Sequence, residues 1–342
     1  MPILQTSLTR LLNIELPIIQ APMGLATNPA LVSAVSYAGG LGILASTSLN
    51  PGEVRQVIQE TRELTDRPFG VNLILRESVE HAEERLKIFL EEGTPIVHFF
   101  WGDPSPYIER VHAAGALVMH TVASAAEARR SVDAGVDVIV AQGWEAGGHV
   151  WGEVATLPLV PLVVDAVAPT PVVAAGGIAD GRGMAAALAL GAAGVWLGTR
   201  FLASEEAGAH PFYKEMLLQA KETDTFYSCL FDMVWPNAPH RALRNSTFNN
   251  WEAAGRPPSG QRPGEGDVIA HWADGRPIVR YGTIPYPGIT GEIEAMALYA
   301  GQSVGLVKSI KPAAEIVKEL AEEAERVLRQ LAGLIQAEEK VS

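Results

Sequence analysis

Short runs of apolar and β-branched residues alternate with longer segments of helical periodicity from Pro17 to Phe201. This alternation is typical of successive βα units around a parallel sheet, because strands covered by helices are apolar along most of their length. We identify eight predicted strands, which begin roughly 20 to 30 residues apart, the size of one βα unit. The predicted strands are Ile18–Met23, Leu41–Ser46, Phe69–Leu75, Pro95–Gly102, Ala116–Val122, Val136–Gly143, Pro171–Gly177 and Ala193–Phe201.

Eight consecutive units favour a closed barrel over an open doubly wound sheet, which ordinarily has fewer strands and a glycine-rich phosphate fingerprint after its first strand. Here the first strand is followed by Ala21–Gly24 (APMG), which lacks that fingerprint. Glycines follow several of the predicted helices, at positions where glycine commonly ends a helix. The predicted fold class is α/β, a TIM-type (β/α)8 barrel within residues 1–203.

The pattern changes after the eighth strand. Residues 204–222 are predicted to be helical, whereas residues 224–291 are rich in Pro, Gly, Asn and Trp and show no sustained periodicity. We interpret residues 204–291 as an insertion. Because it contains Trp235, Trp251 and Trp272, it is either a lid over the active face or a surface excursion with a small core of its own.

The remaining segment, residues 292–342, is predicted to return to the barrel and to end in a helix. Residues 311–337 form an amphipathic pattern with apolar positions at Ile316, Leu320, Ala324, Leu328 and Leu331. A stripe of this kind is most often buried against a core. We therefore expect the helix to close the barrel wall.

Composition excludes several classes of function. The net charge of −13 is repulsive toward phosphate backbones, which disfavours a nucleic-acid partner. The lone cysteine, Cys229, cannot form an intrachain disulfide, and the N-terminal residues lack the layout of a signal peptide. No apolar stretch reaches the roughly 20 residues of a membrane span. A cytoplasmic protein that is not associated with membranes is the expectation.

Barrel enzymes place their binding and catalytic groups at the carboxyl ends of the strands, because the βα loops gather there. Unusual residues follow several of the predicted strands in this sequence. They are Pro22–Gly24, Asn72, His120–Thr121, Gln142–His149 (QGWEAGGH), Ala175–Gly177 and Gly198–Arg200.

The glycines after strands seven and eight predict a phosphate site. Gly176, Gly177 and Gly198 let backbone N–H groups approach a phosphate, and barrels often bind phosphate at these two strand ends. A helix that begins near Gly181 would point its positive end at the same place. The alternative is that these glycines only end their strands tightly.

His149 is the candidate acid or base, since it follows two glycines at the active face and imidazole titrates near neutral pH. A hydrogen-bonded structural role is the alternative. His120 is expected to be packed, His98 to lie in the core or a pocket wall, and Glu145 to be a base, a cofactor or substrate contact, or simply solvated. Neither a Ser-His-Asp order, nor a Cys-His pair, nor metal-ligand spacing stands out, so no metal is predicted.

Six motifs together resemble one family of enzymes, the nitronate monooxygenases, formerly called 2-nitropropane dioxygenases. The resemblance spans residues 15–310 in order. The motifs are Gln20–Met23, Gly70–Asn72, Gln142–His149, Ala174–Gly181, Leu197–Phe201 and Ala300–Ser303.

The resemblance implies an FMN-dependent enzyme that oxidises alkyl nitronates with O2 to a carbonyl compound and nitrite, without reduced nicotinamide. It implies His149 as the catalytic base, a nitronate or nitroalkane as the small-molecule substrate, and possible assembly into a homo-oligomer. The flavin contacts that it implies are Pro22, Met23, Asn72, Gln142, Gly147, Gly148, Gly176, Gly177, Gly198, Thr199 and Gln302.

The same scaffold also resembles flavin-dependent reductases that use NAD(P)H to reduce quinones or enoyl thioesters. His149 is followed by Val150–Gly152, where several relatives have a small or basic residue before the glycine. Arg244–Ser246 and Gly198–Phe201 are similar to the quinone-reductase branch. Reduction by a nicotinamide therefore remains the alternative reaction.

Overall fold

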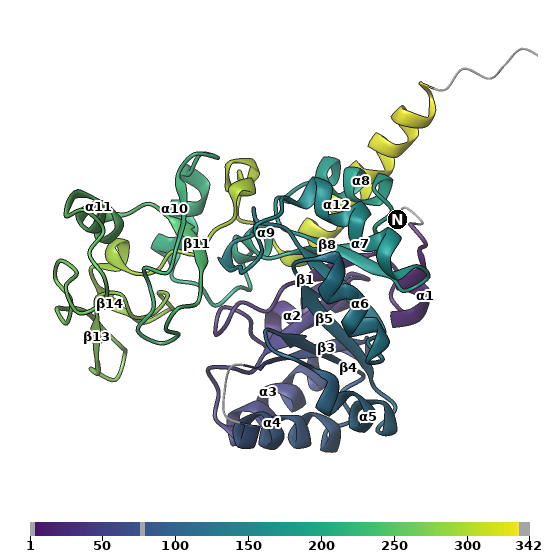
Figure 1. Ribbon diagram of the computed structural model, residues 1–342, viewed down its shortest axis with the longest axis horizontal. Helices are drawn as coiled ribbons and strands as arrows, with labels where there is room; N and C mark the ends of the chain where they lie inside the picture. The colour runs from purple at the N-terminus through teal and green to yellow at the C-terminus, as the bar shows by residue number, and fades with distance from the viewer. Residues whose placement is uncertain (1–3, 76–78, 335–342) are drawn as a thin grey trace, which may run out of the picture.

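The computed structural model describes residues 4–75 and 79–334. Within them eight parallel strands close into a barrel in the order β1-β2-β3-β4-β5-β6-β8-β9. Helices lie around these strands (Figure 1). Closure is made by β1, in which Ile19 pairs with Leu41 on one side and with Trp196 on the other. The barrel strands are β1 Ile18–Gln20, β2 Leu41–Ala45, β3 Phe69–Ile74, β4 Ile96–Phe100, β5 Leu117–Val122, β6 Val138–Gln142, β8 Val172–Ala175 and β9 Gly194–Leu197. The predicted (β/α)8 barrel is confirmed.

Helices surround the barrel, and their starts follow local sequence signals. Asn28, Asn50, Ser124 and Asp180 each cap a helix by accepting a backbone N–H with the side chain, an interaction worth about 1 kcal/mol. The helices around the barrel are α1 Ser7–Leu12, α2 Pro29–Tyr37, α3 Pro51–Leu64, α4 Val79–Glu91, α5 Ser105–Ala113, α6 Ala125–Asp133, α7 Thr156–Val167, α8 Gly181–Ala189, α9 Thr199–Leu202 and α12 Ala313–Ala332.

Two hydrophobic cores stabilise the barrel. One lies between the strands and the surrounding helices, and the other fills the barrel interior with side chains such as Ile43, Met119 and Val173. Leu8 and Leu12 of α1 join the inner core. Burying a side chain of this size contributes about 1.5–3 kcal/mol, so the interior is a packed core.

Several strands are shorter than predicted: β1 ends at Gln20 instead of Met23 and β4 at Phe100 instead of Gly102, and the largest difference is at β9. The eighth strand was expected to run to Phe201, but β9 ends at Leu197 and a helical turn, α9, begins at Thr199. Gly198 is followed by Thr199, Arg200 and Phe201, and a helical turn of four residues is too short to produce a helical periodicity that would mark the boundary. Leu202 donates its N–H to the Gly198 carbonyl, which makes these residues helical.

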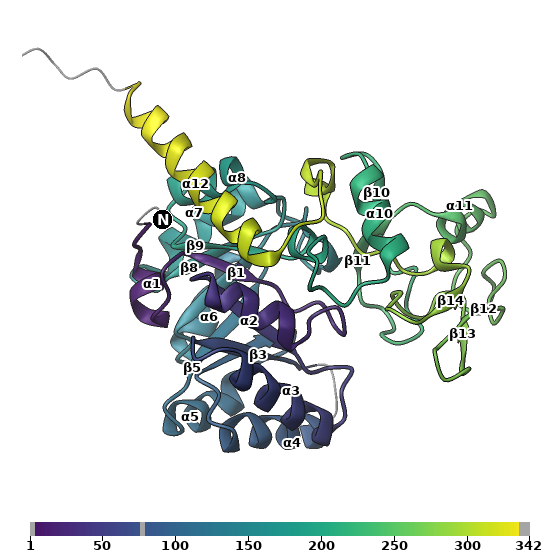
Figure 2. The same cartoon turned by 180° about the vertical axis from the view of Figure 1, so that it is seen from behind.

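Residues 204–310 form a lobe beside the barrel (Figures 1 and 2). Residues 224–291, which show no sustained periodicity in the sequence, contain several short strands and one helix. Each is too short to produce a sustained pattern. The elements of the lobe are α10 Pro211–Gln219, β10 Thr225–Ser228, β11 His240–Leu243, α11 Ser246–Ala253, β12 Val268–His271, β13 Pro277–Val279, β14 Thr290–Gly291, η1 Ile293–Ala295 and η2 Gln302–Leu306.

The core of the lobe is continuous with the barrel rim. Leu202 of α9 packs in one cluster with Tyr213 of α10, Leu298 and Val307. Ser204, where the chain leaves the barrel, forms a β-bridge with Lys311, where it returns. The lobe is therefore attached at its base and shares its packing with the barrel.

Helix α12 packs along α8 and α2 before it projects away from the barrel (Figure 2). Its buried face includes Ile316, Leu320 and Ala324, which confirms the predicted apolar stripe at those positions. The helix ends at Ala332, and residues 335–337 of the predicted helix lie outside the described residues. Among the helices of the described ranges, none is both long enough and apolar enough to span a lipid bilayer.

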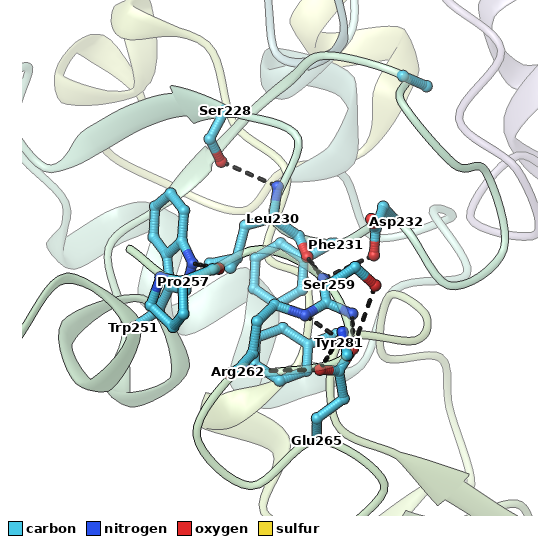
Figure 3. A network of polar contacts seen from close by, with 12 residues as sticks. Ser228, Leu230, Phe231, Asp232, Trp251, Pro257, Ser259, Arg262, Glu265 and Tyr281 are labelled. Carbon is cyan, nitrogen blue, oxygen red and sulfur yellow. Dashed lines mark hydrogen bonds and ion pairs between the residues drawn. The ribbon is translucent and has the colours of Figure 1, made fainter. Parts of the chain in front are cut away.

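A buried arginine, Arg262, connects separate segments of the lobe through hydrogen bonds (Figure 3). The Arg262 side chain is only 3% exposed. It donates to the Leu230 carbonyl at 2.8 Å, to Asp232 at 2.6 Å and to Glu265 at 2.9 Å. Its guanidinium carbon lies 4.2 Å from the centre of the Tyr281 ring. These contacts fix the start of the loop that continues to Trp235.

The Arg262 contact should make the lobe sensitive to acid. The hydrogen bond from Arg262 is the main cause that lowers the pKa of Glu265 from 4.5 to about 2. The ionised carboxylate therefore contributes stability above pH 4.5, and that stability is lost as the pH falls toward 2. We expect Glu265→Gln to lower the free energy of unfolding by about 1 kcal/mol at pH 6, and by progressively less below pH 4.5. Urea unfolding at a series of pH values measures this, and a difference that does not change with pH contradicts it.

Candidate active site

A cavity of about 320 Å³ lies at the carboxyl ends of the barrel strands, between the barrel and the lobe. The barrel contributes glycines and polar side chains together with apolar ones such as Phe100 and Trp196, and the lobe contributes mainly apolar and aromatic side chains. Of the residues that the sequence marked as cofactor contacts, the cavity wall includes Pro22, Met23, Asn72, Gln142, Gly147, Gly148, Gly176, Gly177, Gly198 and Thr199. Gln302 does not line the cavity, although Gly301 and Ser303 on either side of it do.

His149 lies in the cavity wall on a two-residue strand, β7 Gly148–His149. This strand pairs with β11 of the lobe, so that His149 faces His240 across the ladder. The His149 carbonyl accepts the Nε2–H of Gln142 at 3.2 Å. The indole of Trp235 lies over the imidazole, with ring centres 4.1 Å apart. Barrel and lobe therefore position this histidine together.

The facing histidine, His240, is unsuited to proton transfer. Its Nδ1 lies 3.0 Å from the Ala238 carbonyl and its Nε2 accepts the Phe231 N–H at 3.2 Å. Both nitrogens are thus engaged in the neutral ring, and burial lowers the pKa of His240 to about 4. His149 is the histidine of this pair that lines the cavity.

Two amides of the barrel offer hydrogen-bond acceptors. The amide nitrogen of Gln142 donates a hydrogen bond to the His149 carbonyl. The Oε1 of Gln142 is buried and has no hydrogen-bond partner among the described residues. A buried oxygen of this kind lowers the stability of the folded protein by about 1–3 kcal/mol when it stays unpaired. The amide nitrogen of Asn72 likewise forms a hydrogen bond with His98 Nδ1. The cavity therefore presents acceptors that fit a ligand with N–H groups.

The ends of β8 and β9 offer backbone donors. Among the loop and turn hydrogen bonds of the described residues, none is donated by the N–H groups of Gly177, Gly198 or Thr199, and these residues line the cavity together with Gly176. At Gly198 a Cβ would meet only Ala21 and Met23 at ordinary contact distances, so the backbone there is open. Unpaired N–H groups in a glycine-rich concavity are the usual cradle for an anion.

The expected contribution of the α8 N-terminus to this cradle is wrong. Asp180 accepts the N–H groups of Arg182 and Gly183, each at 3.1 Å. Glu323 of α12 accepts the Gly181 N–H at 2.8 Å. Two carboxylates therefore satisfy the positive end of this helix, and an anion would gain little there.

Several glycines of the motifs lie where another backbone segment packs so closely that a side chain would not fit. A Cβ on Gly147 would lie 2.4 Å from the Gly301 nitrogen, and one on Gly176 would lie 2.9 Å from the Gly143 carbonyl oxygen. Gly301 in turn donates to the Thr199 hydroxyl at 3.0 Å. These contacts bring the returning chain against the barrel rim.

The other candidates have structural surroundings. His98 lines the cavity where the barrel strands form its wall, and burial lowers its pKa to about 3. His120 lines a separate cavity of about 480 Å³ and also has its pKa lowered by burial, to about 4. Glu145 accepts both the N–H and the hydroxyl of Thr156, at 2.8 and 2.9 Å. Cys229 is exposed and is not among the cavity residues.

Sequence analysis missed most of the apolar cover of the cavity. The lobe supplies Val234, Trp235, Ile284, Tyr286 and Tyr299. Trp235 was noted only as part of a possible lid. Tyr299 directly precedes the Ala300–Ser303 motif. This position beside a motif is the one local sequence signal for the apolar cover of the cavity.

Comparison with known proteins agrees with this geometry. The family model described as nitronate monooxygenase matches residues 5–323. The chain belongs to the nitronate monooxygenase family. The resemblance drawn from the motifs is confirmed, and the chain is an oxidoreductase of this family.

Three relatives illustrate the range of the family. A (3aS,4S,5R,7aS)-5-hydroxy-7a-methyl-1-oxo-octahydro-1H-indene-4-carboxyl-CoA dehydrogenase of Mycobacterium tuberculosis is 41% identical over 74% of this chain and 70% of its own. A nitronate monooxygenase of Paraburkholderia phytofirmans is 34% identical over 95% of this chain and 96% of its own. The structure of FabK from Thermotoga maritima has a TM-score of 0.81 and 38% identity, and covers 97% of this chain and 99% of its own.

The Thr156 contacts predict a structural role for Glu145. Helix α7 has no side-chain cap from its own N-cap residue, Ala155, and the Glu145 carboxylate takes this place. We expect Glu145→Ala to lower the free energy of unfolding by about 1 kcal/mol and to change turnover by less than tenfold. Urea unfolding and steady-state kinetics measure the two effects. A variant of native stability that has lost turnover would show that Glu145 acts in the chemistry.

Proposed function

We propose that this protein binds FMN in the cavity and oxidises alkyl nitronates with O2 to carbonyl compounds and nitrite. The observation that carries the proposal is the cavity itself, where His149, amide acceptors and unpaired backbone donors converge beneath an aromatic cover. Two nitronate anions and one O2 give two carbonyl compounds and two nitrite ions, so the reaction balances without a nicotinamide.

The residues present fit FMN in two respects. Its phosphate needs hydrogen-bond donors, and the N–H groups of Gly177, Gly198 and Thr199, beside Gly176 on the cavity wall, donate in none of the loop and turn hydrogen bonds of the described residues. Its ring carries polar edges, and the buried Oε1 of Gln142 has no donor. The other proposed contacts on the cavity wall are Pro22, Met23, Gly147 and Gly148. Gln302 is not on the wall, and only its neighbours in the chain, Gly301 and Ser303, would contact the cofactor.

Bound FMN would supply the acceptor for the electrons of the substrate, which O2 then takes. His149 removes the proton when a neutral nitroalkane is bound, because its imidazole lies on the cavity wall. Trp235 and Tyr299 hold the imidazole from two sides, with ring centres 4.1 and 5.5 Å away. Their apolar faces keep water from the substrate and leave a compact apolar space that suits small alkyl groups.

A nicotinamide-dependent reductase is the second candidate. The 38% identity to FabK over nearly the whole chain favours it, as does the CoA thioester named for the Mycobacterium relative. Anaerobic mixing separates the two functions. The first predicts that a nitronate bleaches the flavin while NADH and NADPH do not, and the second predicts the reverse. Failure of every nitronate to reduce the flavin rules out nitronate oxidation.

His149→Ala should retain flavin and lose activity selectively. Removing a general base typically costs 10²- to 10⁴-fold in rate, so we expect a loss of that size with neutral nitroethane. Preformed ethylnitronate has already lost its proton, so its turnover should change by less than tenfold. Oxygen consumption with each substrate measures the contrast, and the nitronate is the internal control. Equal losses on both substrates would mean that His149 has a different role.

A further inference from the structure

Three polar side chains that line the cavity, each nearly inaccessible to solvent, form a chain of hydrogen bonds in its wall. They come from adjacent barrel strands: Asn72 from β3, His98 from β4 and Thr121 from β5. Asn72 Nδ2 lies 3.0 Å from His98 Nδ1 and 3.3 Å from the His98 carbonyl oxygen. His98 Nε2 lies 2.8 Å from Thr121 Oγ1. Each of the three residues is at most 3% exposed.

The chemistry of these atoms fixes the direction of the hydrogen bonds. A carbonyl oxygen only accepts, so the atom of the Asn72 amide that faces the His98 carbonyl must be the nitrogen. The same nitrogen then donates to His98 Nδ1, which must carry a lone pair. The ring proton of His98 therefore lies on Nε2 and is donated to Thr121 Oγ1. Burial keeps the ring neutral by lowering the pKa of His98 to about 3.

The orientation of the Asn72 amide follows from this arrangement. Its nitrogen is held against His98, so its Oδ1 is directed elsewhere. Among the described residues nothing donates to Oδ1, and this oxygen is not among the enclosed unpaired atoms. Since Asn72 lines the cavity, Oδ1 opens onto it as an acceptor.

We propose that His98 is a positioning residue: with Thr121 it locks the Asn72 amide so that Oδ1 accepts an N–H of the bound flavin ring. This inference rests on the proposed binding of FMN. The ring of oxidised FMN carries a single N–H, for which an oxygen is complementary and an amide NH2 is not. Without the lock, the amide can turn and present its NH2 to the cavity. His98 also lines the cavity, but in this role it acts through Asn72.

The flavin-free protein and FMN provide the test, with the dissociation constant read from the quenching of flavin fluorescence. His98→Leu removes both ring hydrogen bonds and should weaken FMN binding roughly tenfold. His98→Gln keeps an acceptor and a donor and should restore most of the affinity. Asn72→Ala should weaken binding as much as His98→Leu does. The double variant should lose no more than Asn72→Ala alone, because the two residues act in series.

If His98→Leu does not fold, Thr121→Val provides a second test of the same chain of hydrogen bonds. Without an acceptor at Thr121, the His98 proton moves to Nδ1, and Asn72 loses its partner. FMN affinity should then fall several-fold. The ¹⁵N shifts of the His98 ring should change from the Nε2–H to the Nδ1–H tautomer, which a merely structural role would not produce.

The outcomes separate this inference from the proposed function. Additive losses in the double variant, or full FMN affinity in Asn72→Ala, would overturn the positioning role and leave FMN binding in place. A wild-type protein that binds no FMN would overturn both. An Nδ1–H tautomer in the wild-type ring would overturn the positioning role alone.

Discussion

The short ladder between β7 and β11 is the interaction on which the site depends. It pairs Gly148 with Arg241 and His149 with His240, and it continues in the hydrogen bond from the Val150 N–H to the Pro239 carbonyl at 3.0 Å. A segment of the barrel loop thereby becomes the edge strand of a sheet in the lobe. Without this ladder His149 would follow two glycines on a loop held by the hydrogen bond from Gln142 to its carbonyl.

Arg241 strengthens the same junction from beneath. Its side chain is buried and donates to the Trp144 carbonyl at 2.9 Å, while its guanidinium carbon lies 4.3 Å from the centre of the Trp144 ring. Desolvation lowers the pKa of Arg241, which is the cost of placing a cation there. The contact with the indole offsets part of this cost, since a desolvated cation–π pair is worth about 2 kcal/mol. The barrel loop that precedes His149 is therefore held by a residue of the lobe.

The barrel could be predicted from the sequence because its strands are continuous apolar runs and its helices begin at local caps such as Asn28 and Ser124. The end of β9 could not, since α9 has only four residues and shows no helical periodicity of its own. The α8 N-terminus shows a different limit. Its cap Asp180 is local, but the second carboxylate, Glu323, lies 142 residues away from Gly181. A contact over that distance leaves no local pattern.

The same distinction explains which part of the site the motifs reveal. The barrel residues that hold a cofactor occur in short motifs, because each strand end and its loop are local in sequence. The cover over His149 comes from residues as far apart as Trp235, Ile284 and Tyr299, which the lobe brings together through its own core. Two proteins with the same barrel motifs can therefore share a cofactor site and differ in the cover. Because the cover decides what reaches the imidazole, the choice between a small nitronate and a bulky thioester depends on the lobe more than on the motifs that identify the family.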